Sequence, residues 1–289
     1  MQVLPIGSPT GHADRTLVAI DTTAGLCSAA LWLRGRCVHV AEPMGQGHSR
    51  RALAMLAALM ADAGLVGGDV DAIAFGAGPG SFTGLRIACG LAQGLGLGWD
   101  RPLVPVDSMQ TLAWQALQQA PGHAGPAGLV LVALDARMGQ VYRCAWRRLG
   151  PHGPDRHGPE GGAGRPAHFG CVLEAGLVDP AVARDEFEQL LDGQPVTRLG
   201  GDGFTAHAAL ARWVERVAGR VEAPDDAVQP DARAVVSRAV DLLAHAGGVA
   251  PEQAAPLYLR EKVALDVAEQ AALRRTLAAG RSAAQGERR

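Results

Sequence analysis

Two aspartates each end a strongly apolar run, and the two runs are nearly the same phrase. Asp21 ends VAID and Asp135 ends VALD. Carboxylates at the ends of strands suit Mg²⁺ and nucleotide phosphates when two lobes hold them on facing sides of a cleft. A lone Asp at such a position also serves simply to cap a turn. The repetition therefore favours a cleft, and it does not by itself favour catalysis.

A glycine-rich turn within residues 71–98 is the second candidate for chemistry. Gly76, Gly78 and Gly80 permit a sharp turn with positive φ, and Ser81 or Thr83 can cap the helix that follows. Backbone N–H groups of such turns commonly face an anion. No Walker lysine follows, and the acidic residue of the dinucleotide fingerprint is missing. A phosphate contact and a purely structural turn both stay open.

The predicted helix after this turn carries glycines on one face. Gly90, Gly94 and Gly98 stand four residues apart, and each costs roughly 1 kcal/mol relative to alanine. The predicted helix at 48–63 is apolar over more than the arc that one sheet would cover. Either the two helices pack on each other, or together they form an exposed patch for another subunit.

Histidines and cysteines do not form a recognisable site. None of the nine histidines pairs with another at the spacing of metal ligands on one helix face, and HExxH and GxSxG are absent. The five cysteines are odd in number and scattered, which is typical of reduced core thiols. We expect no metal site, no catalytic residue and no cofactor on this chain.

Composition sets the class of protein. The chain has 289 residues, 48% of them hydrophobic, and a net charge of −2. It can bury a large core, and its intermixed charges do not predict a nucleic-acid-binding face. No apolar run reaches the length of a membrane span, and no signal peptide is evident. We expect a soluble, cytoplasmic protein without membrane contact.

The order of the elements predicts a duplicated α/β domain. Each half opens with an apolar strand, an aspartate and a hairpin, and the run VTRLGGDG at 196–203 enters a helix through glycines as the first glycine turn does. We predict four segments. They are a flexible tail at 1–15, an N-terminal lobe at 16–120, a C-terminal lobe at 128–263 with a disordered insertion at 150–170, and a charged tail at 264–289.

Hydrophobic periodicity predicts the individual elements. The predicted strands are 17–22, 28–33, 37–41, 73–75, 103–106, 129–135, 140–146 and 196–200, and 256–260 is predicted as an extended end. The predicted helices are 48–63 with Ser49 as N-cap, 81–97, 108–119, 180–191, 204–217 and 231–245.

Several motifs resemble one known family. The runs VAIDTTAGLCSAAL, HSRRALAMLAALMADAGL, GPGSFTGLRIACGLAQGLGLG, VALDARMGQVY and APLYLREKVA are similar to those of the TsaB (YeaZ) family. The resemblance covers most of residues 16–264, and the order of residues at 78–86 is its most specific part.

The resemblance implies a fold and a role. The fold is a duplicated, actin-like and sugar-kinase-like (ASKHA) two-lobe α/β fold. The role is that of a non-catalytic accessory subunit in making N6-threonylcarbamoyladenosine (t6A) at tRNA position 37. Such proteins pair with the catalytic subunit TsaD as a heterodimer through a helical bundle and work with the ATPase TsaE, while TsaC makes the threonylcarbamoyl donor. ATP or ADP would act at the level of the complex, and tRNA would be reached indirectly.

The resemblance also implies two sets of residues. The partner surface on the helices 48–63 and 81–97 comprises Leu53, Leu56, Met60, Leu85, Arg86, Gly90, Gly94 and Gly98. A vestigial nucleotide cleft comprises Asp21, Thr22, Gly78, Asp135, Gly200 and Gly201.

One departure from the catalytic relatives bears on activity. TsaD-like subunits carry two metal-binding histidines four residues apart after the fifth strand, whereas this chain has the run SMQTL at 108–112. The departure favours a pseudo-enzyme. Two alternatives stay open, namely an ATPase or phosphotransferase that uses Asp21 and Asp135, and a homodimer through the same helices when TsaD is absent.

Overall fold

A computed structural model describes residues 2–4, 14–45, 47–118, 128–148, 169–192, 197–225 and 228–260. The chain forms two compact units, Met1–Leu257 and Tyr258–Arg289. Both sheets belong to the first unit. The second unit is described only at 258–260, where Tyr258 is exposed.

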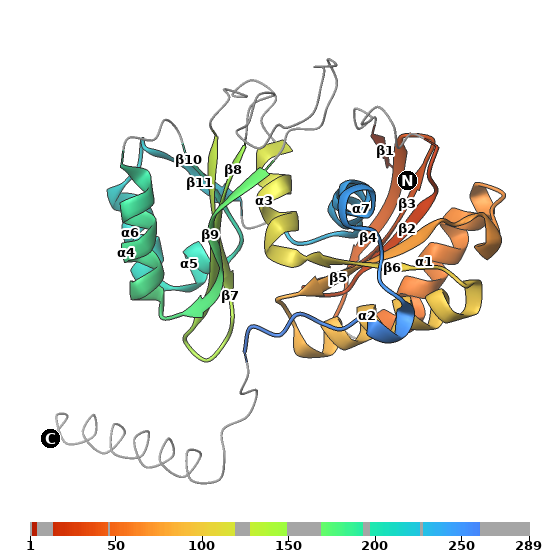
Figure 1. Ribbon diagram of the computed structural model, residues 1–289. Coiled ribbons are helices and arrows are strands. Elements are labelled where there is room, and N and C mark those ends of the chain that lie inside the picture. Colours follow the sequence, from red (N-terminus) through yellow and green to blue (C-terminus); the bar gives the residue numbers. More distant parts are fainter. Residues whose placement is uncertain are drawn as a thin grey trace, which may run out of the picture. The chain divides into compact units, whose positions relative to one another are not determined.

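The first unit contains two sheets (Figure 1). The N-terminal sheet has the order β1-β4-β3-β2-β5-β6, formed by Gln2–Leu4, Arg36–Pro43, Leu26–Leu33, Leu17–Asp21, Ala72–Gly78 and Leu103–Asp107. The C-terminal sheet has the order β11-β10-β7-β8-β9, formed by Val221–Asp225, Thr197–Gly200, Leu129–Asp135, Val141–Arg148 and Phe169–Val178.

The two sheets share one topology. If β2 and β7 are counted as the first strands, then in each half the first strand pairs antiparallel with the second and parallel with the fourth. The second pairs antiparallel with the third, and the fourth pairs parallel with the fifth. β1 is an additional strand that pairs antiparallel with β4. β2 and β7 hold the same central place. The duplication predicted from VAID and VALD is confirmed, and with it the two-lobe, actin-like α/β fold that the resemblance implies.

Helices cover both sheets. The α-helices are α1 (His48–Asp62), α2 (Phe82–Trp99), α3 (Ser108–Gln118), α4 (Pro180–Leu191), α5 (Gly203–Ala206), α6 (Ala208–Arg216) and α7 (Ala232–Ala246), and short 3₁₀ turns lie at Gly67–Asp69 and Pro251–Gln253. α1 and α2 pack on the N-terminal sheet, and α4 and α6 pack in the core of the C-terminal sheet. Among the helices in the described ranges, none has both the length and the apolar character of a membrane span.

The last helix of each half packs on the sheet of the other half. α3 follows β6 in the chain but contacts β7, β8 and β10, and α7 follows β11 but contacts β2, β3 and β5. A hydrogen bond shows the first exchange, since Arg198 Nη1 on β10 donates to Ala116 O on α3 over 3.1 Å. The two halves therefore share their cores, which agrees with their forming one compact unit.

The apolar run of β2 explains its central place. Val18 and Ile20 contribute to the core beneath α1 and α2, whereas Leu17 and Ala19 contribute to the core beneath α7. Successive side chains of a strand point to opposite faces, so a strand covered by helices on both faces must be apolar throughout. Asp21 is the first carboxylate after this run, and it too is fully buried.

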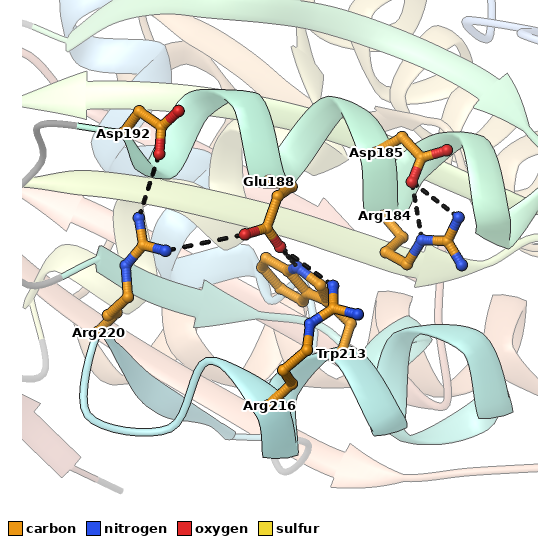
Figure 2. Close-up of polar contacts among 7 residues, drawn as sticks. All are labelled: Arg184, Asp185, Glu188, Asp192, Trp213, Arg216 and Arg220. Atoms are coloured by element: carbon orange, nitrogen blue, oxygen red, sulfur yellow. Dashed lines mark hydrogen bonds and ion pairs between the residues drawn. The ribbon is translucent and has the colours of Figure 1, made fainter.

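Ion pairs join α4 to α6 on the C-terminal sheet (Figure 2). The carboxylate of Glu188 accepts hydrogen bonds from Trp213 Nε1 and Arg216 Nη2, and it lies 3.7 Å from Arg220 Nη1. Beneath this contact Trp213 packs against the rings of Phe187 and Phe204, 6.0 and 6.3 Å away between centroids. Polar and aromatic contacts therefore fix the same pair of helices.

The structure corrects several predicted elements. A strand, β1, lies in the segment predicted as a loose tail, and β9 and β11 were not predicted at all. The helix predicted at 204–217 breaks at His207, whose extended backbone ends α5 and begins α6. Gly47, not Ser49, is the N-cap of α1, and no side chain caps that helix. The boundary near 120–128, most of the insertion at 150–170 and the tail at 264–289 lie outside the described residues, so those predictions stay predictions.

Candidate functional site

The glycine turn between β5 and α2 packs against the chain's own turn at residues 21–23. A Cβ added to Gly76 would lie 2.1 Å from Asp21 Oδ2, and one added to Gly80 would lie 2.5 Å from Thr23 O. The backbone N–H of Ser81 donates to Thr23 O over 2.7 Å. These glycines are explained by the close approach of two turns, which is the structural alternative that the sequence left open.

Thr22 and Gly78, both predicted in the vestigial cleft, also make contacts within the fold. Thr22 Oγ1 donates to Gly84 O over 2.7 Å, and a Cβ at Gly84 would lie 1.9 Å from Thr22 O. Gly78 has a φ of +108°, and a Cβ there would lie 2.7 Å from Leu85 Cδ2. Thr22 therefore holds the start of α2 against the end of β2, and Gly78 lets the end of β5 lie close to Leu85 on α2.

Asp21 is a buried carboxyl group with one unsatisfied oxygen. Its Oδ1 accepts from the N–H and the Oγ1 of Thr23, both over 2.9 Å, whereas Oδ2 has no hydrogen-bond partner among the described residues. Burial raises the pKa of Asp21 to about 6, the hydrogen bonds from Thr23 lower it in part, and the charge of Asp231 raises it further. Ser108 on α3 extends this hydrogen-bond network, since its Oγ donates to Thr23 Oγ1 over 3.3 Å.

Asp135 holds the equivalent place in the C-terminal half but has different neighbours. Its Oδ1 lies 3.2 Å from His207 Nε2 and accepts from the N–H of Arg137 over 2.9 Å. Its own N–H donates to Asp202 Oδ1 over 2.9 Å. The side chain is 17% exposed, so this carboxylate lies near the surface and is already paired. That Asp21 and Asp135 face each other across a cleft stays a prediction.

Gly201 and Gly203 repeat the close packing of the first glycine turn, whereas a Cβ at Gly200 would meet only ordinary contacts at 3.6 Å or more. Gly201 has a φ of +93°, and a Cβ there would lie 2.3 Å from Ala133 O. The turn after β10 thus packs on the end of β7 as the turn after β5 packs on the end of β2. Among the described residues no group of three or more His, Cys, Asp or Glu side chains could hold a metal ion.

The sequence did not predict His207, Asp202 or Ser108 as members of the hydrogen-bond networks around Asp21 and Asp135. A signal existed for two of them, because the duplicated topology makes the turn after β10 the counterpart of the turn after β5. Asp202 and His207 follow VTRLGG in the sequence and so lie beside Asp135. No local pattern marks Ser108, which reaches Thr23 only through the packing of α3.

The glycine ridge of α2 is open. Gly90, Gly94 and Gly98 are exposed, and a Cβ added to any of them would meet no heavy atom within 4 Å outside the helix's own backbone. α1 lies beside α2 but does not fill this ridge. Leu97 on the same helix is 67% exposed. The alternative in which the chain's own helix covers the glycines is therefore wrong.

Only part of the predicted partner surface reaches solvent. Leu53 is 39% exposed, and Arg86 lies on the surface with its guanidinium 3.9 Å from the ring centroid of Phe82. The other three apolar members are buried in the single chain, where they pack toward the sheet, namely Leu56, Met60 and Leu85. The prediction is wrong for these three because the apolar stripe of each helix is its core face.

Comparison with known proteins relates these features to a family. A family model described as "TsaD: tRNA N6-adenosine threonylcarbamoyltransferase" matches residues 40–158. The tRNA threonylcarbamoyladenosine biosynthesis protein TsaB of Escherichia coli is 34% identical over 248 residues, which cover 86% of this chain and 96% of that protein. The protein of the same name from Haemophilus influenzae is 43% identical over 127 residues, covering 44% of this chain and 52% of that protein.

A solved structure agrees with this assignment. A protein of Pseudomonas aeruginosa described as similar to peptidase YeaZ is 31% identical, covers 85% of this chain and 100% of its own, and superposes with a TM-score of 0.66. Similarity over nearly the whole length, in sequence and in fold, leaves one conclusion. This chain belongs to the TsaB (YeaZ) family of tRNA threonylcarbamoyladenosine biosynthesis proteins.

Proposed function

We propose that this chain is a non-catalytic accessory subunit that binds a TsaD-type transferase and is required for t6A formation at tRNA position 37. The partner binds the docking surface, defined as the exposed face of α1 and α2 with Leu53, Gly90, Gly94, Leu97 and Gly98. The chain acts in the cytoplasm, needs no cofactor of its own, and reaches tRNA and the ATPase TsaE through the complex.

The open glycine ridge is the observation that carries the proposal. Three glycines on one helix face leave the backbone of α2 accessible at Cβ distance. α1 packs beside α2 and has exposed Ala54, Ala57 and Ala61, and residues 52–61 contain no polar or charged side chain. A helix of a partner can approach such a surface closely, and close backbone contact provides dispersion energy over its length.

The environments of the aspartates support a non-catalytic role. Asp21 is fully buried beneath Gly76, and Asp135 is already engaged by His207 and Arg137. A Mg²⁺–nucleotide complex needs carboxylate oxygens that can reach the ion. Ser108 begins α3 where the catalytic relatives would carry the first metal ligand, and its hydroxyl bonds to Thr23.

The decisive experiment places leucine on the ridge. Gly90→Leu with Gly94→Leu should abolish co-purification with TsaD and t6A formation in a reconstituted reaction, while raising helix propensity and leaving the fold intact. Gln189→Leu adds the same side chain to an exposed position of α4 and should have no effect. A folded double variant that binds TsaD with unchanged affinity would show that the partner binds elsewhere.

The two alternatives have their own tests. A cleft ATPase predicts ATP hydrolysis by the purified chain that drops on Asp135→Asn, and turnover at background level removes it. A homodimer through the docking surface predicts a mass of two chains in solution, and this species should be replaced by a complex with TsaD when TsaD is added. The Gly90→Leu, Gly94→Leu variant should then be monomeric under all conditions.

A further inference from the structure

A segment near the end of the first unit runs beside α2, the helix that carries the glycine ridge. Residues 249–257, here called the strap, follow α7 and include the 3₁₀ turn at Pro251–Gln253, which contacts α2 (Figure 1). Val249 exchanges two backbone hydrogen bonds of 2.8 Å with the start of β6. The N–H of Leu257 donates to Ala77 O on β5 over 2.7 Å. Both ends of the strap are therefore fixed to the N-terminal sheet.

Between its ends the strap contacts one side of α2. Gln93 Nε2 donates to Ala254 O over 3.0 Å, and Cys89 Sγ donates to the same oxygen over 3.8 Å. A Cβ added to Gly96 would lie 2.9 Å from Pro251 Cγ. Positions 89, 93 and 96 are four and three residues apart, so they share one side of the helix. The strap therefore supports α2 over about two turns.

The supported part of α2 has a low helix propensity. Four of the nine residues from Gly90 to Gly98 are glycine, which is the poorest helix former after proline. The helix ends on Asp100, whose backbone is left-handed with a φ of 55°. Glycine is favoured at such an end, and a negative charge there opposes the helix dipole. Residues 90–98 therefore depend on contacts from outside the helix.

The docking surface requires the same residues to be helical. Gly90, Gly94 and Gly98 lie on one face only while this part of α2 is a helix. A partner that had to order the helix would lose affinity by the free energy of ordering. Better helix formers at the three glycines would stabilise the helix, but their side chains would fill the ridge. A contact on another side of α2 stabilises the helix and leaves the ridge open.

We propose that the strap is a positioning element of the docking surface, and that the hydrogen bond from Gln93 to Ala254 is its main link to α2. The strap keeps residues 90–98 helical in the free chain, so that the ridge is formed before the partner binds. The inference rests on the proposed function, because that function identifies the partner as a TsaD-type transferase.

Hydrogen exchange of the free chain tests the strap without a partner. Gln93→Met keeps a side chain of similar length that cannot donate to Ala254 O. Exchange of the backbone N–H groups of residues 94–99 should become at least about tenfold faster, with exchange in α7 unchanged. Gln189→Met makes the same substitution at an exposed position of α4 and should leave residues 94–99 unchanged. Wild-type exchange in Gln93→Met overturns the proposal.

Affinity for TsaD tests whether the strap serves the docking surface. At a temperature where every variant is fully folded, Gln93→Met should weaken binding at least about fivefold, and Gln189→Met should match the wild type. Pro251→Gly loosens the strap from its own side, through the contact with Gly96, and should also weaken binding. This second variant keeps Gln93, so a loss of binding cannot come from a lost contact of Gln93 with TsaD.

A rescue variant separates positioning from direct contact with the partner. Asp100→Gly should stabilise the end of α2, and position 100 lies outside both the strap and the docking surface. Added to Gln93→Met, it should restore slow exchange in residues 94–99 and bring the affinity for TsaD to within about twofold of the wild type. If exchange is restored and binding stays weak, Gln93 or the strap contacts TsaD itself, and the positioning role is wrong.

The wild-type chain separates this inference from the proposed function. If the wild type binds TsaD and Gln93→Met binds equally well, the strap is not a positioning element and the proposed function stands. If the wild type does not bind TsaD, the proposed function fails. The strap then only stabilises the fold, and the inference fails as well.

Discussion

Replacing Asp21 by asparagine should stabilise the protein at neutral pH. The carboxyl group is fully buried, its Oδ2 has no partner among the described residues, and its pKa is raised from 3.8 to about 6. Burial is the main cause, because desolvation disfavours the charged form. Asparagine keeps the shape and the acceptor for Thr23, and it carries no charge at any pH.

The magnitude follows from the two pKa values. In the unfolded chain Asp21 releases its proton near pH 3.8, whereas in the folded chain it holds the proton to about pH 6. Between these values the folded state binds more protons, so the free energy of unfolding falls as pH rises through this window. The difference corresponds to about 3 kcal/mol as an upper bound. Well below pH 3.8 Asp21 is protonated in both states and the effect vanishes.

Urea unfolding from pH 4 to pH 7.5 measures the effect as the difference between variant and wild type. The difference should be small at pH 4, rise through pH 6 and then level off. Glu42→Gln supplies a control, because the hydrogen bond from Arg51 lowers the pKa of Glu42 from its ordinary 4.5. The stabilisation from this group is lost only as pH falls below that value, so the difference for this variant should stay flat from pH 5 to pH 7.5. A difference for Asp21→Asn that stays constant over the whole range would refute the reasoning.

Two further predictions concern stability. Gly84→Ala should destabilise the fold by about 1–3 kcal/mol, because the new Cβ would lie 1.9 Å from Thr22 O. Gly90→Ala should stabilise the fold by about 0.5–1 kcal/mol, because nothing lies within 4 Å of the added Cβ. Equal changes in the free energy of unfolding, measured in urea, would contradict the packing of the glycine turn. Glu188→Ala should cost about 1–3 kcal/mol, because it leaves the buried Trp213 without its acceptor, and an unchanged Tm would mean that the contacts in Figure 2 do not hold α4 to α6.

The sequence predicts the elements whose signal is local. β2 and β7 are continuous apolar runs, and α1 and α2 show helical periodicity with Gly64 and Ser81 at their ends. β9 escapes prediction because it follows a stretch rich in Gly and Pro and carries glycine and glutamate itself. β11 is five residues long and contains a proline, and β1 is a strand only because it pairs with β4.

The residues of the candidate site also divide into those that the sequence predicts and those that it does not. Asp21, Asp135 and the glycine ridge follow from repetition and spacing, which sequence can show. The partners of the aspartates do not, because they arrive by tertiary packing. His207 meets Asp135 through a break in a helix that periodicity predicts as continuous, and Ser108 meets Thr23 through a helix that packs on the other half.

The glycines of this chain fall into two groups, those that the fold requires and those that the fold of the single chain does not explain. Gly76, Gly80, Gly84 and Gly201 are required by the fold, because a Cβ at each would lie within 2.5 Å of the chain's own atoms. The three ridge glycines meet nothing, have no positive φ, and together lower helix stability by about 3 kcal/mol relative to alanine. The single chain gives no reason for this cost. A partner helix that must approach the backbone of α2 more closely than a Cβ allows would explain the glycines. The axes of the two helices would then lie about 8 Å apart.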